Sequence, residues 1–392
     1  MTDASPDAEP PVPTLRTVAR EWGRIGCIGF GGPPTHIALL RELCVTRRRW
    51  LTADEFEDAI AACNLLPGPA STQLAIYCAR RVRGRAGAIV GGAAFIVPGL
   101  GLILVLAAVF LSGSTPRWVR GAAAGAGAAV AAVAVHAGVG LLPASWRRGR
   151  DANRVRWIAY LAAGATAAAV LGPWLVFVLL GCGGIELAAR RWRRTGTSPI
   201  VFAPIMFVGS TAVAGGLASL VWVALKVGAL SYGGGFVIIP LMRADAVHRY
   251  HWMTNAEFLN AVALGQITPG PVVQTIAVVG FAAAGVGGGL VAAAVAFSPS
   301  FLFVLIGAHH FDRLRTNQHA RSFLDGAGPA AIGAILGSAV PLAVALREPW
   351  QYAVLGAAAI VLLLLRRSVV FTLLAAGVVG TTAALAGVSI PR

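Results

Sequence analysis

Long stretches without any charged residue dominate this sequence. Four of them are residues 86–116, 121–146, 157–185 and 195–225. A helix that crosses a bilayer needs about 20 apolar residues, so most such stretches can hold one crossing and the longest can hold two. Charged residues make up only 12% of the chain, against about 25% in a soluble domain. The sequence therefore predicts an all-α polytopic membrane protein and excludes an ordinary soluble enzyme.

Arginines gather in short tracts between these apolar stretches. The formal net charge is +16, and a strongly basic protein can bind nucleic acid. Here the tracts fall between predicted spans, which is the positive-inside pattern of a polytopic protein. They lie at 47–49, 80–85, 147–156 and 190–194. We therefore expect contact with the lipid bilayer and no nucleic-acid partner, and we interpret the acidic, proline-rich residues 1–13 as a disordered tail.

The sequence contains an internal duplication. Residues 24–76 align with 226–278 without a gap, and 18 of the 53 positions are identical. The identities include tryptophan, arginine and phenylalanine residues and one Pro-Gly-Pro triplet in each half, which a bias toward small residues does not explain. The duplication divides the chain into two homologous halves, residues 14–195 and 196–392.

Basic loops exchange sides between the two halves. The loop after the Pro-Gly-Pro triplet is basic in the first half, at 80–85, but the matching residues 281–289 are uncharged. The next loop is uncharged in the first half, at 111–116, but its counterpart carries arginines between 313 and 321. Because basic loops tend to face the cytoplasm, we interpret the halves as an inverted repeat of opposite topology.

Each half has two segments that cannot continue as regular helix. Gly29–Pro34 is matched by Ser231–Gly235, and Asn64–Pro69 is matched by Gln266–Pro271. Gly-Gly and Pro-Gly-Pro interrupt helices, and interrupted helices form the substrate site in inverted-repeat transporters. Basic residues flank Asn64–Pro69 on both sides, which favours a re-entrant hairpin over a single span. A proline kink in an ordinary helix is the alternative.

These segments resemble those of the chromate ion transporter (CHR) family in its long, two-domain form. The resemblance covers nearly the whole chain and implies a multi-pass protein of the inner (plasma) membrane that exports chromate, with sulfate as the related oxyanion. It also implies homologous halves of opposite orientation. The alternative function is uptake of sulfate or another oxyanion, or an anion channel. The motifs that carry the resemblance are Phe-Gly-Gly-Pro at 30–33, Asn64 to Pro69, Tyr-Gly-Gly-Gly at 232–235 and Gln-x-x-Pro-Gly-Pro at 266–271.

The interrupted segments contain the candidate substrate-binding residues. Free backbone N–H groups at a helix break bind anions, and neighbouring amides can either bind the anion or cap the helix ends. Arg24 and Lys226 align just before the glycine-rich breaks and can face a dianion, with snorkelling to the interface as the alternative. The full set is Arg24, Gly31, Gly32, Asn64, Pro67, Gly68, Pro69, Gln73, Lys226, Gly233, Gly234, Gln266, Thr268, Pro269, Gly270, Pro271 and Gln274.

Two aligned acids have two interpretations. Glu55 and Glu257 occupy equivalent positions and can act as proton-coupling groups. Each also closes a Thr-x-x-Glu capping box, with Thr52 and Thr254. We favour the cap.

Several other polar and small residues are assigned from their positions. Glu186 and Asp325 lie near the ends of predicted spans and are expected at the membrane interface. His36 lies beside the first break and can titrate. Gly121 and Gly125 follow the small-x-x-x-small pattern that is typical of helix packing in membranes.

No motif indicates an enzyme, a metal site or a cofactor. A Walker A motif needs Gly-Lys-Ser/Thr, and the only lysine, Lys226, is followed by Val227. Export of a dianion from an inside-negative cell is electrically favourable, by about 2.3 kcal/mol for each charge at about 100 mV. The membrane potential or a proton gradient can therefore drive efflux. The sequence leaves the oligomeric state open, a homodimer included.

Overall fold

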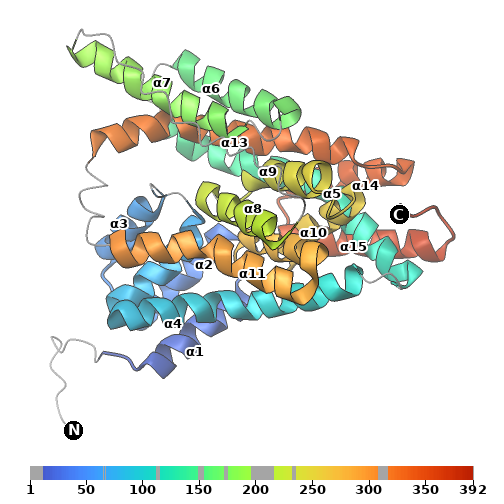
Figure 1. The fold of residues 1–392 in the computed structure, drawn as a ribbon, viewed down its shortest axis with the longest axis horizontal. Coiled ribbons are helices and arrows are strands. Elements are labelled where there is room, and N and C mark those ends of the chain that lie inside the picture. The colour runs from blue at the N-terminus through green and yellow to red at the C-terminus, as the bar shows by residue number, and fades with distance from the viewer. Residues whose placement is uncertain are drawn as a thin grey trace.

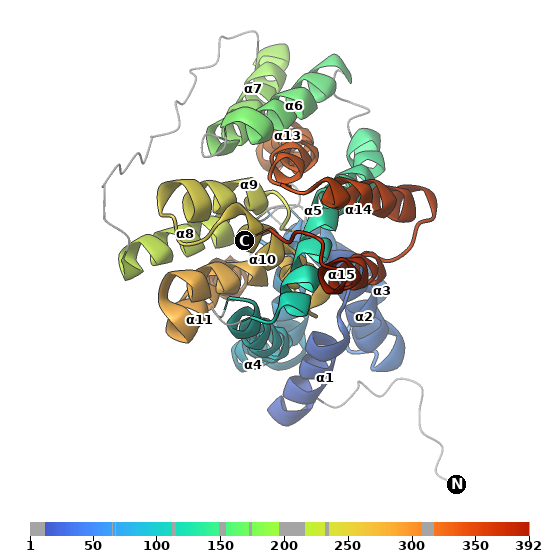
Figure 2. The ribbon, with the colours of Figure 1, turned by 90° about the vertical axis from the view of Figure 1, so that its right-hand side faces the viewer.

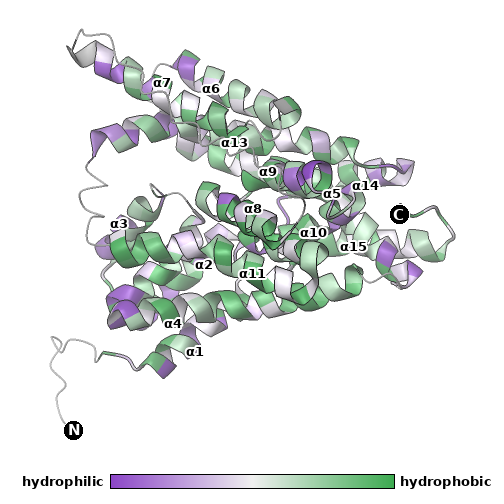
Figure 3. Ribbon diagram, in the orientation of Figure 1, coloured by the Kyte–Doolittle hydropathy of each residue, from purple (hydrophilic) through white to green (hydrophobic). Residues whose placement is uncertain are grey.

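The chain forms a bundle of helices that differ greatly in length (Figure 1). The described part is helical, with loops but no strands, which confirms the all-α fold class. Figure 3 shows apolar residues along most of the bundle, with hydrophilic residues mainly toward its two ends. Four helices are long and apolar enough to cross a membrane: Ala70–Phe110, Arg117–Arg147, Val272–Gly307 and Gln318–Val344. The computed structural model describes residues 12–64, 66, 68–111, 115–148, 154–171, 175–195, 216–231, 235–307 and 317–391.

The helices of the two halves follow the same order. Those of the first half are α1 (Leu15–Ile28), α2 (Pro33–Arg41), η1 (Glu42–Arg47), α3 (Ala53–Cys63), α4 (Ala70–Phe110), α5 (Arg117–Arg148), α6 (Arg154–Thr166), η3 (Ala167–Leu171) and α7 (Leu175–Thr195). Those of the second half are α8 (Leu217–Leu230), α9 (Ile238–Arg243), η5 (Ala244–Arg249), α10 (Asn255–Ile267), η6 (Val272–Gln274), α11 (Thr275–Gly307), α13 (Gln318–Val344), α14 (Pro349–Ala359), η8 (Ile360–Leu364) and α15 (Val369–Leu385). The duplication seen in the sequence is therefore also present in the structure.

Helices α4 and α11 each contain a sharp reversal of direction. Gly84 has φ +65° and Gly285 has φ +63°, a conformation that favours glycine. Beyond the first reversal, a Cβ atom placed on Gly87 would lie 2.4 Å from the Ala79 carbonyl oxygen. Each helix is therefore a hairpin with a short arm and a long arm. The two reversals are 201 residues apart, whereas residues 24–76 align with 226–278 at an offset of 202. The second half therefore has one residue fewer between its Pro-Gly-Pro triplet and its reversal.

The long arms of α4 and α11 pack against each other in opposite directions. Gly92 lies against Phe301, and Leu104 lies against Gly289, so the beginning of one arm meets the end of the other. The equivalent helices α5 and α13 also pack together. This pairing supports the prediction of an inverted repeat, whose orientation in a membrane stays a prediction.

The outer helices are exchanged between the halves. Helices α14 and α15 pack on α5 of the first half, and α6 and α7 pack on α13 of the second half, as Figure 2 shows. Small residues allow the backbones to approach closely: Gly125 lies against the Ala376 carbonyl, and Gly333 lies against the Leu161 carbonyl. Gly121 also lies against α15, so the predicted packing role of Gly121 and Gly125 is confirmed.

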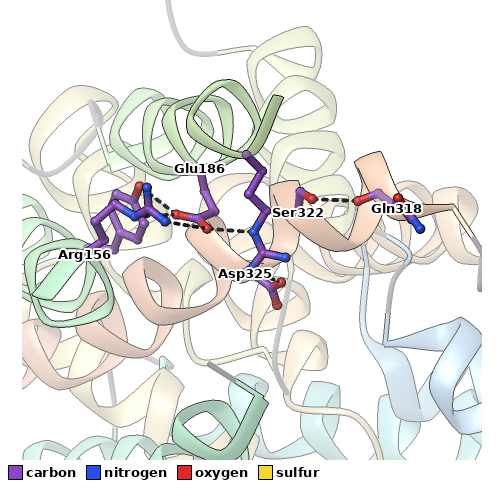
Figure 4. Close-up of polar contacts among 7 residues, drawn as sticks. Arg156, Glu186, Gln318, Ser322 and Asp325 are labelled. Atoms are coloured by element: carbon purple, nitrogen blue, oxygen red, sulfur yellow. Dashed lines mark hydrogen bonds and ion pairs between the residues drawn. The ribbon is translucent and has the colours of Figure 1, made fainter. Parts of the chain in front are cut away.

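A network of charges around the buried Glu186 fixes α6 and α7 to α13 (Figure 4). Glu186 accepts a hydrogen bond from the Tyr160 hydroxyl and pairs with Arg156 at 3.1 Å and Arg190 at 2.8 Å. Arg190 also pairs with Asp325 of α13 at 2.8 Å. Glu186 is fully buried between helices, and its expected depth at the membrane interface stays a prediction. Its burial is tolerated because both of its carboxylate oxygens have partners.

Candidate functional site

Both Pro-Gly-Pro segments interrupt helices, as the sequence predicts. Helix α3 ends at Cys63 before α4 begins at Ala70, and α10 ends at Ile267 before η6. The central glycines, Gly68 and Gly270, have φ values of +116° and +104°, which strain any residue with a Cβ atom. The prolines that the structure describes in these segments are buried: Pro69, Pro269 and Pro271.

The first Pro-Gly-Pro segment lies at the tip of a hairpin. Glu55, in the first turn of α3, pairs with Arg81, near the end of the short arm of α4. The two helices that flank the segment therefore have their outer ends side by side, and Gly68 lies at the opposite end. This is the geometry of the predicted re-entrant hairpin.

Both acids at the outer ends of these hairpins are helix caps. The capping boxes of Thr52 with Glu55 and of Thr254 with Glu257 are complete. A hydrogen bond from the Thr52 N–H, reinforced by Arg81, holds the pKa of Glu55 below its usual value in spite of partial burial. Glu55 is therefore ionised at neutral pH and stabilises α3, which argues against proton carriage by this residue.

Each Pro-Gly-Pro loop packs against the long arm of the other half. A Cβ atom placed on Gly68 would lie 3.2 Å from Ser300 Oγ of α11. One placed on Gly99 of α4 would lie 2.0 Å from the Pro269 carbonyl oxygen. Gly99 and Ser300 each directly follow a proline within their helix. The loops therefore occupy equivalent places and approach the interior from the two halves.

The glycine-rich break of the first half joins the Pro-Gly-Pro loop of the second half. The Gly270 N–H donates a hydrogen bond to the Gly29 carbonyl at 3.1 Å, and Gly32 lies beside Val272. Gly31 and Gly32 have φ values of +98° and +75°, which favour glycine at both positions. Three candidate residues lie outside the described part of the chain: Pro67, Gly233 and Gly234.

His36 links this junction to the beginning of α4. Its Nε2 atom lies 2.9 Å from the Gly29 carbonyl oxygen, and its Nδ1 atom lies 3.3 Å from Ser71 Oγ. Ser71 is in the first turn of α4, directly after the first Pro-Gly-Pro segment. Three of the four predicted breaks therefore meet around His36, whereas the sequence predicted a titratable group beside the first break alone.

Buried polar atoms without a hydrogen-bond partner gather beside the breaks. A buried polar group without a partner costs about 1–3 kcal/mol, so native proteins keep few of them. Most of those found here are hydroxyl or amide nitrogen atoms, which can donate to an anion. The N-terminus of α4 has no side-chain cap, and its N–H groups and dipole also favour negative charge. Among the described residues, the atoms are Thr72 Oγ1, Ser231 Oγ, Gln266 Nε2, Gln274 Oε1 and Ser300 Oγ.

The candidate amides and hydroxyls have distinct surroundings. Gln73 and Gln274 are buried, and the side chain of each lies beside the central glycine of its own loop. Gln274 Nε2 donates to the Ile96 carbonyl at 2.8 Å. The Thr268 hydroxyl donates to the Leu264 carbonyl at 2.8 Å, so Thr268 caps the end of α10. Gln73, Gln266 and Gln274 therefore remain the candidate amides closest to the loops.

The aligned cations differ in their surroundings. Lys226 Nζ lies 2.5 Å from Oδ2 of the buried Asp245, whereas Arg24 is exposed on α1. Asn64 is also exposed, at the end of α3. Asp245 could not be found from the repeat, because the aligned first-half residue is Leu43. Lys226 can meet a dianion only in competition with Asp245.

A cavity of about 490 Å³ lies where α5, α10 and α14 meet. Arg120, Glu257, Asn260 and Gln351 are among its polar lining residues. It lies at the N-terminal end of α10, whose other end carries the second Pro-Gly-Pro loop. The cavity is therefore separate from the junction of the breaks but is connected to it by one helix.

A sequence profile and individual relatives both relate this chain to chromate transporters. The sequence profile described as "Chromate transporter" matches residues 16–187 and 218–381. A chromate transport protein of Cupriavidus metallidurans is 32% identical over 345 residues, which cover 85% of this chain and 84% of that protein. A chromate transport protein of Pseudomonas aeruginosa is 28% identical, with 87% and 84% covered. No solved structure matches the chain significantly. The two profile segments and the full-length relatives show that the chain belongs to the chromate transporter family.

Proposed function

We propose that this protein exports chromate across the inner (plasma) membrane by alternating access. The observation that carries the proposal is the junction of interrupted helices, where buried donors without protein partners surround two opposed Pro-Gly-Pro loops. Uncharged donors can bind a dianion without the cost of further buried charge. Relatives named as chromate transport proteins support the choice of substrate.

The proposed direction of transport, out of the cell, follows from the charge of the substrate. A dianion that leaves an inside-negative cell gains about 4.6 kcal/mol at about 100 mV. Efflux then needs no ATP-binding motif, whereas uptake of the same ion would need coupled cations. The membrane potential, alone or with a proton gradient, is the proposed energy source.

The proposed orientation places the arginine-rich turn of the first half in the cytoplasm. Arg47 and Arg48 pair with Glu21 in the middle of α1, and the turn at Gly84 belongs to the same half. The equivalent turn at Gly285 has no neighbouring charge and faces the other side in this proposal. Residues 14–195 and 196–392 would then be two transporter units of opposite topology.

Uptake of chromate into everted membrane vesicles tests this function. Such vesicles reverse the membrane, so export appears as accumulation, and an inside-positive potential should increase it. Sulfate has the same shape and charge and should compete. Uptake no greater than in vesicles without the protein would contradict the proposal. Transport that is equally fast in both directions and proportional to voltage would indicate a channel.

The pair formed by Lys226 and Asp245 yields a prediction that separates binding from packing. Removal of Lys226 alone leaves Asp245 buried without its partner, which destabilises the protein. If Lys226 also binds substrate, the double variant Lys226→Ala/Asp245→Ala should recover folded protein but not chromate uptake. Protein amount in the membrane and uptake are measured for both single variants and the double variant. Recovery of uptake in the double variant would restrict Lys226 to a structural role.

A further inference from the structure

We propose that His36 binds a proton each time the junction binds its oxyanion, so that one proton leaves with each exported oxyanion and the membrane potential drives the movement of the remaining negative charge. This inference deepens the proposed function and rests on it. His36 is fully buried. Its described contacts are the Gly29 carbonyl, the Ser71 hydroxyl and the Phe95 ring, whose centre lies 5.0 Å from that of the imidazole. None of these groups carries a charge.

Charged side chains on the neighbouring helices are engaged elsewhere or are exposed. A protonated His36 would therefore be a buried cation without a counter-charge from these helices. On α1, α2 and the hairpin arms of α4, Glu21 pairs with Arg47 and Arg48, Arg41 pairs with Glu57, and Arg80 donates to the Val304 carbonyl. The other arginines there are exposed: Arg16, Arg20, Arg24, Arg81, Arg83 and Arg85. The remaining titratable side chains on these helices are Cys27, Tyr77 and Cys78.

The contacts of His36 fix the tautomer of its neutral form. The Gly29 carbonyl can only accept, so Nε2 carries the hydrogen and Nδ1 accepts from the Ser71 hydroxyl. A proton added to Nδ1 reverses the second hydrogen bond, because Nδ1–H then donates to Ser71 Oγ. The Ser71 hydrogen is released and can donate to an anion at the N-terminus of α4. Protonation therefore supplies one further donor to the site.

Electrostatics favour the proton only when the anion is present. The N-terminus of α4 is the positive end of the helix dipole and opposes a cation nearby. A bound dianion outweighs the opposing helix dipole and neutralises the charge of the buried imidazolium. Because coupling of two ligands is reciprocal, protonation must also strengthen anion binding. The proton enters Nδ1 from water on the side where the anion binds and returns to water where the anion leaves.

The second half of the chain has no histidine at the position equivalent to His36. The residue equivalent to His36 is Ile238, which is buried. The described junction therefore offers one titratable imidazole, and we expect one proton for each oxyanion. A purely structural histidine that ties down the Gly29 carbonyl would show no such coupling.

Proton movement in proteoliposomes tests the inference. The full chain is reconstituted with a pH-sensitive dye in the lumen, at zero membrane potential and at an alkaline pH where chromate is fully deprotonated. Chromate entry should acidify the lumen for the wild type. His36→Gln keeps an amide donor near the position of Nε2 for the Gly29 carbonyl, and it should lose the acidification and the pH dependence of any remaining flux. His136→Gln, on α5, serves as the matched control and should behave as wild type.

The outcomes separate this inference from the function on which it rests. A wild type that moves chromate without acidification overturns the role of His36 and leaves the transport function standing. A wild type that moves no chromate overturns both. Acidification by His36→Gln equal to that of the wild type also overturns the inference. If His36→Gln does not fold, Ser71→Ala replaces it, and this variant should shift the pH profile of chromate flux while the imidazole is retained.

Discussion

Replacement of Gly270 by valine should reduce chromate uptake into everted vesicles by about 100-fold or more, since displacements of about 1 Å at a binding site have effects of that size. Gly270 has φ +104°, and a Cβ atom there would lie 3.0 Å from both Oε1 and Nε2 of Gln274. The new side chain must therefore displace Gln274 or the loop. Either movement also weakens the hydrogen bond from the Gly270 N–H to the Gly29 carbonyl.

A glycine on the long arm of α11 provides the control for this experiment. No atom lies within 4 Å of a Cβ atom placed on Gly287 of α11, so Gly287→Ala should retain full uptake. Uptake is normalised to the amount of protein in the membrane, which separates loss of transport from loss of folding. Unchanged uptake by Gly270→Val would show that the second Pro-Gly-Pro loop is not part of the pathway.

Replacement of Gly125 by leucine should remove most of the folded protein. A Cβ atom on Gly125 would lie 2.1 Å from the Ala376 carbonyl oxygen, so the clash is with the backbone of α15 and cannot be relieved by a rotamer change. Overpacking typically costs about 1–3 kcal/mol, and more where backbones must separate. Size-exclusion chromatography in detergent measures the folded fraction.

Gly140, on the same helix, is the matched control. It is exposed, and no atom lies within 4 Å of its added Cβ atom. Gly140→Leu should therefore give a normal elution profile. If Gly125→Leu also elutes normally, α5 and α15 do not pack as closely as described.

Local features of the sequence predicted much of the fold. Helix spans follow from charge-free stretches. The interruptions at Gly68 and Gly270 follow from the Pro-Gly-Pro triplets, because a glycine with positive φ between two prolines cannot continue a helix. The capping boxes at Thr52 and Thr254 are also local, and both form as predicted. These features need only a few consecutive residues, which a sequence shows directly.

Contacts between distant residues could not be predicted in this way. Asp245 pairs with Lys226, and Ser300 lies beside Gly68. The first half has no acidic residue at the position aligned with Asp245 and no hydroxyl residue at the position aligned with Ser300, so the repeat did not mark either contact. The gapless alignment also paired Gln73 with Thr275, whereas the structure places Gln73 and Gln274 in equivalent positions beside their loops. A single residue lost after the second Pro-Gly-Pro triplet hid this relation.

Labelling of single cysteines at Arg85 and Val286 tests the central claim most directly, namely that two copies of one unit meet in opposite orientation. Both positions are exposed, and each directly follows the reversal glycine of its hairpin, Gly84 or Gly285. In a chain whose exposed Cys27 is replaced, a membrane-impermeant thiol reagent should label position 85 only from the cytoplasmic side and position 286 only from the opposite side. Labelling of both positions from the same side would contradict the inverted repeat and the site that it forms.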